Sequence, residues 1–382
     1  MKKKILFIHT TYRSVGGEDI AVEKEYEFLS KEYEIRRIYI SNNSKNILND
    51  LFIFLFNRNY LMSLKLKKII SEYNPDLAYV HNTWYKGSLS IFYTLSSLKI
   101  PFVIKLHNFR YFCTRSFSSK SHLMEKPYCP ACGYSKIKIF NKYFINSFLK
   151  SFMVNRYGRK YIKILKDNTQ QILVLTDFHQ NFLSNLGVDK EKISVFPNYL
   201  YSQRPIYKNN LDKYFIYAGR VSKEKGVEQL INSFKNCNFQ DIKLMIVGSG
   251  PNYNEYLEKY NSDNILFLNQ LNNEETLKLI SKSQGVVTAT KLYEGQPTLL
   301  CEASLLGIPS IFPISGGIAE FFPSDYKYSF EQFNYDDLEF KLKKLASENL
   351  EQIGMSNYEF ITKYLSKNKL LSLFNKILEF DI

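Results

Sequence analysis

Alternation between short apolar runs and helical segments constrains this chain more than any other feature. Five apolar runs in the first half have the length and composition of buried strands: Ile5–His9, Ile35–Ile40, Leu77–His81, Phe102–Leu106 and Ile172–Thr176. Segments with helical periodicity separate them, such as Ile20–Lys31 and Leu61–Tyr73. Continuous apolar strands with helical crossovers predict a parallel sheet that is covered on both faces.

The same alternation begins again after residue 210. The prolines and polar residues from Pro197 to Asn210 predict a linker. The second set of expected strands is Tyr214–Ala218, Lys243–Val247, Ile265–Leu268, Gly285–Thr288 and Pro309–Phe312. Helices are expected at Gly226–Phe234, Tyr253–Tyr260, Glu274–Lys282 and Pro297–Leu306. The 382 residues therefore predict two doubly wound α/β domains in series, in which ligands bind beyond the carboxyl ends of the strands.

Composition is typical of a globular protein without a membrane-spanning segment. Hydrophobic residues make up 45% and charged residues 23%, which is enough to form two cores and excludes a fibre or a disordered chain. The apolar run Ile5–Ile8 is too short for a signal peptide, and no stretch reaches the ~18 apolar residues of a transmembrane helix. Five cysteines without a secretory signal argue against a disulfide scaffold. We therefore expect a cytoplasmic protein.

The net charge of +14 is concentrated in the first half of the chain. Residues 1–200 hold 31 Lys and Arg against 15 Asp and Glu, and residues 51–166 hold 20 against 3. This excess indicates an anionic partner for the first domain, although a solvated basic face explains it equally well. Lys136–Lys166 interleaves cations with Phe, Tyr, Ile and Leu, which is typical of a segment lying on an anionic membrane with its aromatic side towards the lipid.

The strongest motif follows the expected strand Gly285–Thr288. It runs from Glu294 through Gly295, Gln296, Pro297, Thr298 and Leu299 to Glu302. A helix that begins at Pro297 leaves the N–H groups of Thr298 and Leu299 free, which suits a diphosphate. Glu302 lies four residues after Thr298, on the same helix face. The two carboxylates flank an anion site, and we expect them to bind sugar hydroxyls on either side of it.

A second motif, Gly219-Arg220…Glu224-Lys225-Gly226, follows the strand Tyr214–Ala218. Gly219 permits a tight turn, and Arg220 and Lys225 both lie where they could reach phosphate oxygens. Two weaker signals lie in the first half. Gly16-Gly17 precedes a helix and would let the backbone approach a ligand, or is simply a turn. His107 ends the strand Phe102–Leu106 and either meets a substrate hydroxyl or is a structural histidine.

Taken together, these motifs resemble glycosyltransferase family 4. Glu294 and Glu302 with seven residues between them, the Gly219–Gly226 motif, Gly248-Ser249-Gly250-Pro251 and Gly16-Gly17 occur in the order and spacing of that family. The resemblance covers nearly the whole chain. It implies the GT-B fold, which consists of two Rossmann-like doubly wound domains facing across a cleft. The expected domains are residues 1–200 for the acceptor, 201–360 for the nucleotide-sugar, and a helix over 361–382 that crosses back to the first domain.

The resemblance also implies roles for individual residues. Arg220 and Lys225 would hold the diphosphate, Glu302 the ribose hydroxyls and Glu294 the hydroxyls of the donor sugar. His107 would contact the donor sugar near the reacting carbon. The predicted catalytic residues are thus His107, Arg220, Lys225 and Glu294. The predicted donor-binding residues are Gly16, Gly17, Gly219, Gly295, Thr298, Leu299 and Glu302. Two positions depart from the family pattern. His107 is followed by Asn108, whereas the family commonly has a His-Asp pair here. The segment Gly316–Glu320 resembles the family's later Gly-Gly…Glu segment, but Ala319 stands where proline is frequent.

The implied activity is retaining transfer of a sugar from a UDP- or GDP-linked donor to a saccharide or lipid-linked acceptor in surface polysaccharide assembly. No metal or cofactor is expected, because cationic side chains near the phosphates take the place of a metal ion. Peripheral binding to an anionic membrane surface is part of this prediction, and nucleic acid is not an expected partner. Two alternatives stay open: a GT-B-fold nucleotide-sugar epimerase, and a non-enzymatic nucleic-acid-binding protein suggested by the basic first domain.

Three cysteines in the first half have part of the spacing of a zinc site. Cys129 and Cys132 resemble one zinc knuckle, and Cys113 lies upstream. The cysteine count leaves the fourth ligand missing, and His122 or His107 could serve; reduced structural thiols or a redox-labile pair explain the cluster as well. Cys237 and Cys301 are expected to be buried apolar residues.

Overall fold

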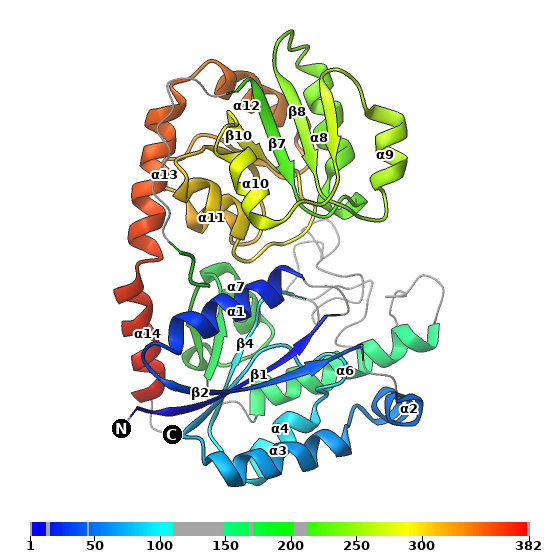
Figure 1. Cartoon of the computed structure of the whole chain (residues 1–382), viewed down its shortest axis with the longest axis vertical. Coiled ribbons are helices and arrows are strands. Elements are labelled where there is room, and N and C mark those ends of the chain that lie inside the picture. Colours follow the sequence, from blue (N-terminus) through cyan, green and yellow to red (C-terminus); the bar gives the residue numbers. More distant parts are fainter. Residues whose placement is uncertain are drawn as a thin grey trace. The chain divides into compact units, whose positions relative to one another are not determined.

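The computed structural model describes residues 2–12, 16–43, 46–109, 148–167, 171–201 and 212–379. The chain divides into two compact units (Figure 1). Unit 1 consists of Met1–Tyr199 and Lys367–Ile382, and unit 2 of Leu200–Ser366. Each unit contains a six-stranded sheet in which every pair of neighbouring strands is parallel. The described helices include none that is both long and apolar enough to cross a membrane.

The sheet of unit 1 has the strand order β2-β1-β3-β4-β5-β6. Its strands are β1 (Lys4–Thr11), β2 (Glu34–Ser41), β3 (Leu77–Val80), β4 (Phe102–Lys105), β5 (Gln171–Val174) and β6 (Ile193–Val195). The order reverses between β1 and β3, so the connections after these two strands leave towards opposite faces of the sheet. Such a reversal is where open α/β sheets bind ligands.

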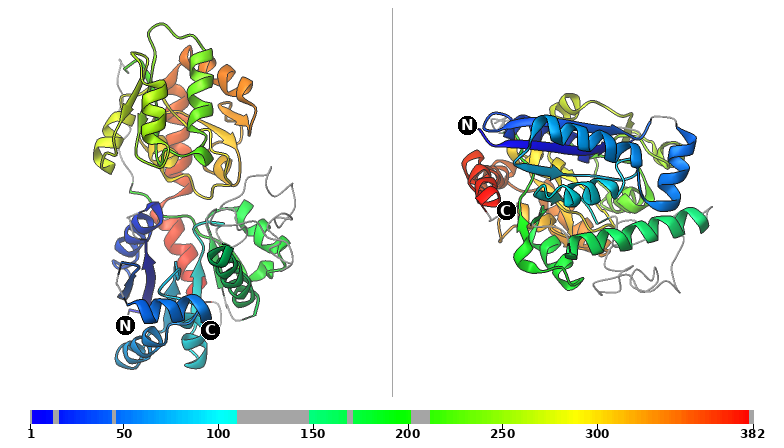
Figure 2. Two further views of the ribbon diagram at one scale, coloured as in Figure 1. Left: turned by 90° about the vertical axis from the view of Figure 1, so that its right-hand side faces the viewer. Right: turned by 90° about the horizontal axis from the view of Figure 1, so that it is seen from below.

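Helices cover both faces of this sheet. They are α1 (Gly17–Leu29), α2 (Ile47–Phe56), α3 (Tyr60–Tyr73), α4 (Ser90–Ser97), α6 (Phe148–Asp167), α7 (Asp177–Asn185) and α14 (Lys367–Glu379). One face packs against α1 and α14 (Figure 2). There the ring of Phe374 contacts those of Tyr79 and Phe196. Helices α3, α4 and α6 lie on the opposite face. Strand residues such as Phe7 and Ile8 are therefore both fully buried, one on each face.

The sheet of unit 2 has the order β12-β11-β10-β7-β8-β9. Its strands are β7 (Tyr214–Ala218), β8 (Lys243–Val247), β9 (Ile265–Leu268), β10 (Gly285–Val287), β11 (Ser310–Ile314) and β12 (Ser329–Glu331). The chain moves outwards from β7 to β9, and then returns to β10 on the other side of β7. The reversal point therefore lies between β7 and β10, the two strands that carry the strongest sequence motifs.

The helices of unit 2 form two layers. They are α8 (Val227–Asn236), α9 (Tyr253–Tyr260), α10 (Asn273–Ile280), α11 (Thr298–Leu305), α12 (Tyr335–Ala346) and α13 (Leu350–Tyr364). Helices α8, α9 and α12 share one core with alternate strand residues, and α10, α11 and α13 share the other. Cys237 belongs to the first core and Cys301 to the second; both are free, buried thiols, as expected.

All ten expected strands are present, while the short strands β6 and β12 were not predicted. Other expectations need correction. The terminal helix expected over 361–382 is interrupted at Leu365–Ser366, between the end of α13 and the start of α14, and serine is favoured as a residue preceding a helix. Tyr157 and Tyr161 of α6 do not face outwards, since both are buried in unit 1. At these two positions the predicted lipid-facing aromatic side is therefore wrong.

Candidate active site

Two loops meet at the carboxyl ends of β7 and β10. The first carries Gly219–Gly226 and the second carries Thr288–Pro297. The N–H of Lys291 donates to the carbonyl oxygen of Glu224 over 3.0 Å, which joins the loops. At Gly226 the backbone has a φ of +69°, and an added Cβ would lie 1.9 Å from the carbonyl oxygen of Ala289. Only glycine permits this approach, so the motif's last glycine is needed to bring the two loops together.

Lys225 and Glu294 form the central contact between these loops. Lys225 Nζ lies 2.6 Å from Glu294 Oε1, and Thr290 Oγ1 donates to the same oxygen over 2.9 Å. Both side chains of the ion pair are partly exposed. The second carboxylate oxygen of Glu294 accepts a hydrogen bond from none of the described residues, so it can still accept from hydroxyl groups of a ligand.

The loop after β11 fixes the backbone that carries Glu294. The N–H of Gly317 donates to the carbonyl of Glu294 over 2.9 Å, and Ser315 Oγ donates to the carbonyl of Leu292 over 2.8 Å. Gln332 Nε2 donates to both Ser315 Oγ and the carbonyl of Thr290. At Gly316 an added Cβ would lie 2.2 Å from the carbonyl oxygen of Glu294. The Gly316-Gly317 segment therefore holds the backbone of Glu294 in place.

Arg220 extends from the same turn as Lys225. Tyr217 donates its hydroxyl to the Arg220 carbonyl over 2.8 Å, which fixes the backbone. The turn is tight, because an added Cβ at Gly248 would lie 2.0 Å from the Gly219 carbonyl oxygen. The Arg220 side chain is exposed, and its guanidinium pairs with no described carboxylate. It is therefore a cation that an anionic ligand can reach without breaking an existing ion pair.

Helix α11 begins one residue later than expected. Pro297 is the residue preceding the helix, and the Thr298 N–H donates to the Gln296 carbonyl over 3.0 Å. The expectation that the Thr298 N–H is free is therefore wrong, because the turn at Gln296–Pro297 uses it. The Leu299 N–H donates to no described backbone group, which leaves a donor at this end of the helix. Glu302 follows four residues after Thr298 and is only 6% exposed; Gly295 and Gln296 are also buried.

Replacing Gly226 by alanine should destabilise unit 2. The new Cβ would meet the Ala289 carbonyl, and alanine disfavours the left-handed backbone, so we expect a loss of about 2–3 kcal/mol in the free energy of unfolding. Urea denaturation measures this effect. Gly17→Ala is the control, because a Cβ there meets nothing within 4 Å and the backbone is helical. Equal stability of Gly226→Ala and the wild type would contradict the close approach of the two loops.

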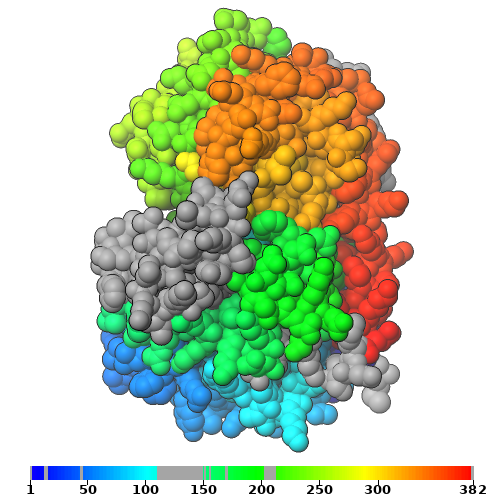
Figure 3. All heavy atoms as spheres, turned by 180° about the vertical axis from the view of Figure 1, so that it is seen from behind, coloured from blue at the N-terminus to red at the C-terminus, as the bar shows by residue number. Residues whose placement is uncertain are grey.

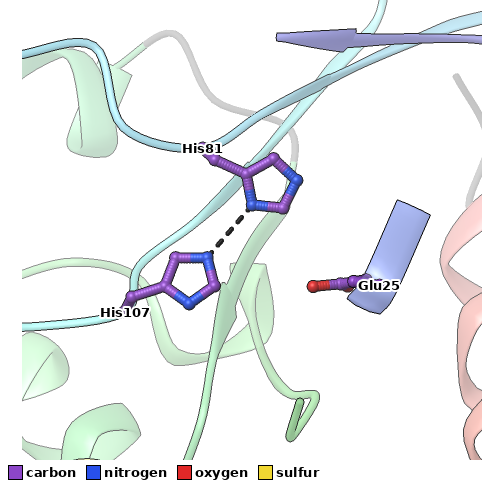
Figure 4. A group of neighbouring side chains, drawn as sticks. All are labelled: Glu25, His81 and His107. Carbon is purple, nitrogen blue, oxygen red and sulfur yellow. Dashed lines mark hydrogen bonds between the residues drawn. The ribbon is translucent and has the colours of Figure 1, made fainter. Parts of the chain in front are cut away.

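In unit 1, three histidines occupy the ends of adjacent strands. His9 lies near the end of β1, and His81 and His107 follow β3 and β4. His81 Nδ1 and His107 Nε2 lie 3.1 Å apart, so one ring donates to the other (Figure 4). Burial holds the pKa of both rings well below the usual value, and the nearby charges of Lys105 and His9 lower it further. The pair is therefore neutral at pH 7, and His107 acts as a hydrogen-bonding group without a charge.

Glu25 on α1 lies close enough to His81 and His107 to suggest a metal site, since one ligand atom of each lies within 4.8 Å of the others. Both Glu25 oxygens are already used, however. Tyr79 donates its hydroxyl over 2.6 Å, and Lys105 Nζ donates over 2.8 Å from a fully buried position. A cation bound here would face the Lys105 ammonium at short range. Glu25 is therefore the counter-ion of Lys105, and the donor set does not fit a metal.

The N-terminus of α1 is capped by the chain's own carboxylates. Asp19 accepts from the Gly16 N–H over 2.8 Å and contacts His9 Nε2 at 2.8 Å. Burial alone would raise the pKa of Asp19, but these hydrogen bonds and the His9 charge lower it overall. Glu18 accepts from Tyr12 Oη and from Asn108 Nδ2, over 2.5 and 2.9 Å. Asn108 thus serves as a donor to Glu18, a role that an ionised aspartate could not fill.

The structure groups the predicted residues into two sets. Gly219, Arg220, Lys225, Glu294, Gly295, Thr298, Leu299 and Glu302 lie at one edge of unit 2, and Gly16, Gly17 and His107 lie at the carboxyl edge of unit 1. The predicted zinc ligands Cys113, Cys129 and Cys132 lie outside the described residues. His9 and His81 were not predicted as site residues, although Ile8-His9, Val80-His81 and Leu106-His107 share one signal, an apolar strand followed by histidine. Thr290, Ser315 and Gln332 were not predicted either, because no pattern marks them.

Comparison with known sequences finds a family match in the second half. Residues 202–359 match the family model described as glycosyl transferases group 1. The chain is 28% identical over 173 residues to the amylovoran biosynthesis glycosyltransferase AmsD of Erwinia amylovora, covering 41% of this chain and 47% of AmsD. It is 26% identical over 214 residues to the capsular polysaccharide biosynthesis glycosyltransferase CapM of Staphylococcus aureus, covering 52% and 55%. The chain thus spans about half the length of these curated relatives.

Similarity to solved structures extends over the whole chain. The structure of HepE from Anabaena in complex with UDP and glucose superposes with a TM-score of 0.71 at 13% identity, covering 98% of this chain and 99% of HepE. Sucrose-phosphate synthase from Thermosynechococcus elongatus gives 0.71 at 14% identity, covering 98% of both chains. At this identity the similarity establishes the fold alone. The two Rossmann-like units are therefore those of a GT-B fold, as predicted, and residues 202–359 of the chain match the glycosyl transferases group 1 family.

Proposed function

We propose that this chain is a retaining glycosyltransferase that moves a sugar from a UDP- or GDP-linked donor to a saccharide or lipid-linked acceptor. One observation carries the proposal: Lys225 and Glu294 form an ion pair at the reversal point between β7 and β10, and Arg220 lies exposed on the same loop as Lys225. This edge offers an unpaired guanidinium for a diphosphate and a carboxylate oxygen for sugar hydroxyls. A nucleotide-sugar requires both kinds of contact within a few ångströms of each other.

The named relatives support both the reaction and its setting. AmsD and CapM are named for the biosynthesis of amylovoran and of a capsular polysaccharide. HepE is described in complex with UDP and glucose, and also with UDP-glucose. We therefore propose a role in surface polysaccharide assembly. The proposed location is the cytoplasm, with peripheral binding at the inner face of the membrane where a lipid-linked acceptor would be available.

Within unit 2, each residue has a proposed role in holding the donor. Arg220 and Lys225 bind the diphosphate, helped by the Leu299 N–H. Glu294 accepts from hydroxyls of the sugar and Glu302 from those of the ribose. The turns at Gly219 and Gly295 let the backbone approach, and Thr298 supplies its side-chain hydroxyl.

Unit 1 would bind the acceptor. There His107 is proposed to exchange a hydrogen bond with a sugar hydroxyl, and Gly16 and Gly17 to let the backbone approach the phosphates. His107 is suited to this as a neutral ring, since its Nε2 is fixed by His81 and its Nδ1 has no partner among the described residues.

The proposed chemistry breaks the bond between the anomeric carbon and the phosphate oxygen and forms a bond from the acceptor oxygen on the same face. The acceptor's proton passes to the departing phosphate, which leaves as the nucleoside diphosphate. Arg220, Lys225 and the helix end would stabilise the charge that develops on that leaving group. Glu294 is occupied by Lys225 and Thr290, which argues against its acting as a nucleophile.

A donor panel tests the proposal. The purified chain is incubated with UDP-, GDP- and ADP-sugars and a saccharide or polyprenyl-diphosphate sugar acceptor. We expect release of nucleoside diphosphate that depends on the acceptor, and a product whose anomeric configuration, read by NMR, matches that of the donor. Activity should persist in EDTA, because Arg220 and Lys225 supply the positive charge.

Other outcomes would contradict specific parts of the proposal. An inverted product would exclude retention, and a free epimer without acceptor consumption would favour an epimerase. Activity lost in EDTA and restored by magnesium or manganese would overturn the metal-free mechanism. Loss of activity together with irreversible unfolding would instead indicate a zinc site at Cys113, Cys129 and Cys132.

A further inference from the structure

Helices α2 and α3 of unit 1, which follow one another in the chain, expose an unusual amount of apolar surface. Nine large apolar side chains between residues 47 and 64 are exposed, and Ile47 and Leu48 reach 83% and 82%. We call these nine the apolar patch; they are Ile47, Leu48, Leu51, Phe52, Leu55, Phe56, Tyr60, Leu61 and Leu64. Atoms of this blue part of the chain lie at the surface in Figure 3. So many exposed apolar side chains within one short stretch of the chain are typical of an interaction site.

Packing within unit 1 does not account for the apolar character of α2. Of its ten residues, only Ile53 is buried. Helix α3 differs, because Met62, Leu66, Ile70 and Tyr73 anchor it against the unit. Helix α2 is thus held at the surface with most of its apolar side chains in solvent. Its sequence suits an environment less polar than water.

Three cations gather at the C-terminal end of α2. Arg156 Nη1 donates to the Leu55 carbonyl over 2.9 Å, and Lys160 Nζ donates to the Phe56 carbonyl over 3.4 Å. Burial lowers the pKa of Lys160, and the charges of Arg156 and Arg58 lower it further. The three side chains therefore lie within electrostatic range of one another.

None of these three cations pairs with a described carboxylate. The nearest acid in the sequence, Asp50, is taken by Lys86 at 3.0 Å. Lys65 and Lys67 on α3 are exposed and also lack a described acidic partner. The apolar patch is therefore bordered by uncompensated positive charge. Binding of an anion would relieve the mutual repulsion at its edge.

We propose that the segment formed by α2 and α3 docks on an anionic lipid bilayer. The apolar patch would enter the boundary of the acyl chains, while Arg58, Arg156 and Lys160 contact lipid phosphates. A bilayer offers an apolar phase next to a layer of phosphates. It can therefore bind the apolar patch and the neighbouring cations at the same time, which is why we propose a bilayer as the partner. A nucleic acid would satisfy the cations but leave the apolar patch in water. The inference rests on the peripheral membrane location proposed above. It assigns the apolar contact to α2 and α3 rather than to aromatic residues of Lys136–Lys166, and from that segment it uses only the cations Arg156 and Lys160.

Co-sedimentation with vesicles tests the docking surface. The full chain is mixed with vesicles of phosphatidylcholine alone or with 30 mol% phosphatidylglycerol, at low and high salt, roughly 0.02 and 0.5 M. We expect binding to the anionic vesicles that falls as salt rises. Leu48→Gln/Phe52→Gln should reduce the partition coefficient tenfold or more. Arg58→Gln/Lys160→Gln should reduce it about 25-fold at low salt, since each cation near an anionic surface contributes about fivefold.

Matched variants control for the general effect of each change. Leu98→Gln/Phe340→Gln removes the same two side-chain types from exposed positions elsewhere, and Lys243→Gln/Lys278→Gln removes two exposed positive charges from unit 2. Both should bind within twofold of the wild type. In a second measurement, Phe52→Trp should be quenched by vesicles of brominated phosphatidylglycerol, whereas Phe340→Trp should not.

Three results would overturn the proposal. The first is a wild type that ignores anionic vesicles at low salt. The second is undiminished binding by Leu48→Gln/Phe52→Gln. The third is self-association of the wild type that this double variant abolishes without any vesicle binding. Nucleotide-sugar binding by thermal shift, which reports on unit 2, separates failure of docking from failure of the transferase proposal.

Discussion

Sugar transfer should fall by about a hundredfold or more when Arg220 is replaced by alanine or Glu302 by glutamine. Each change removes one charge that we propose contacts the donor, and losing such a contact in an active site costs about 3 kcal/mol of transition-state stabilisation. Arg220 is exposed and unpaired among the described residues, so its loss should leave the fold intact. Glutamine has nearly the same shape as Glu302, which limits disturbance of the buried position. Initial rates with a saturating acceptor measure the effect.

A neighbouring lysine provides the control for Arg220. Lys223 lies on the same turn, is exposed and carries the same charge, but belongs to neither predicted phosphate-binding position. Lys223→Ala should keep nearly full activity. Near-wild-type rates for Arg220→Ala would contradict the proposed contact between Arg220 and the diphosphate. Equal losses for Arg220→Ala and Lys223→Ala would show that the general positive charge of the turn matters, and not Arg220 specifically.

Replacing Glu25 by glutamine should cost unit 1 about 3–5 kcal/mol in the free energy of unfolding, because it leaves the buried ammonium of Lys105 without a counter-ion. The double variant Glu25→Leu/Lys105→Met should recover most of this loss, because it removes both charges. Chemical denaturation of the two variants and the wild type provides the comparison.

The loss in Glu25→Gln should depend on pH in a defined direction. Burial already lowers the pKa of Lys105 below 10.5 in the folded chain, although Glu25 raises it again. Without Glu25 the folded pKa falls further, so the unfolded chain binds more protons, and stability rises with pH up to about 10.5. The deficit should therefore shrink as the pH increases. A Glu25→Gln variant as stable as the wild type, together with a wild type destabilised by EDTA, would instead make Glu25 a metal ligand.

The sequence predicted which residues meet at the β7–β10 edge of unit 2 because the fold class determines which strand ends lie side by side. Lys225 and Glu294 are 69 residues apart, yet each follows a strand that a doubly wound sheet places at its reversal point. Their direct contact at 2.6 Å could not be predicted, since it depends on side-chain conformations in two loops. The prediction for the Thr298 N–H was wrong for a local reason. A turn at Gln296 uses that donor before the helix begins.

The first unit was harder to predict, because its important contacts are isolated polar residues within apolar segments. His81 and Glu25 carry no motif, and their meeting depends on how α1 crosses the sheet. The pattern of α6 was ambiguous in another way. Tyr157 and Tyr161 are one helical turn apart, and a stripe of aromatic residues has the same periodicity whether it faces lipid or a protein core. Only the packing of α6 against the sheet decides between the two.

The position of α14 has a consequence for how the chain is made. Phe374 completes the aromatic cluster of unit 1 with Tyr79 and Phe196, yet it follows the whole of unit 2 in the sequence. During synthesis, all residues of unit 2 emerge from the ribosome before this helix does. Unit 2, which is continuous in sequence, can therefore fold while unit 1 still exposes part of its core. We expect the domain that is translated first to be the one that finishes folding last.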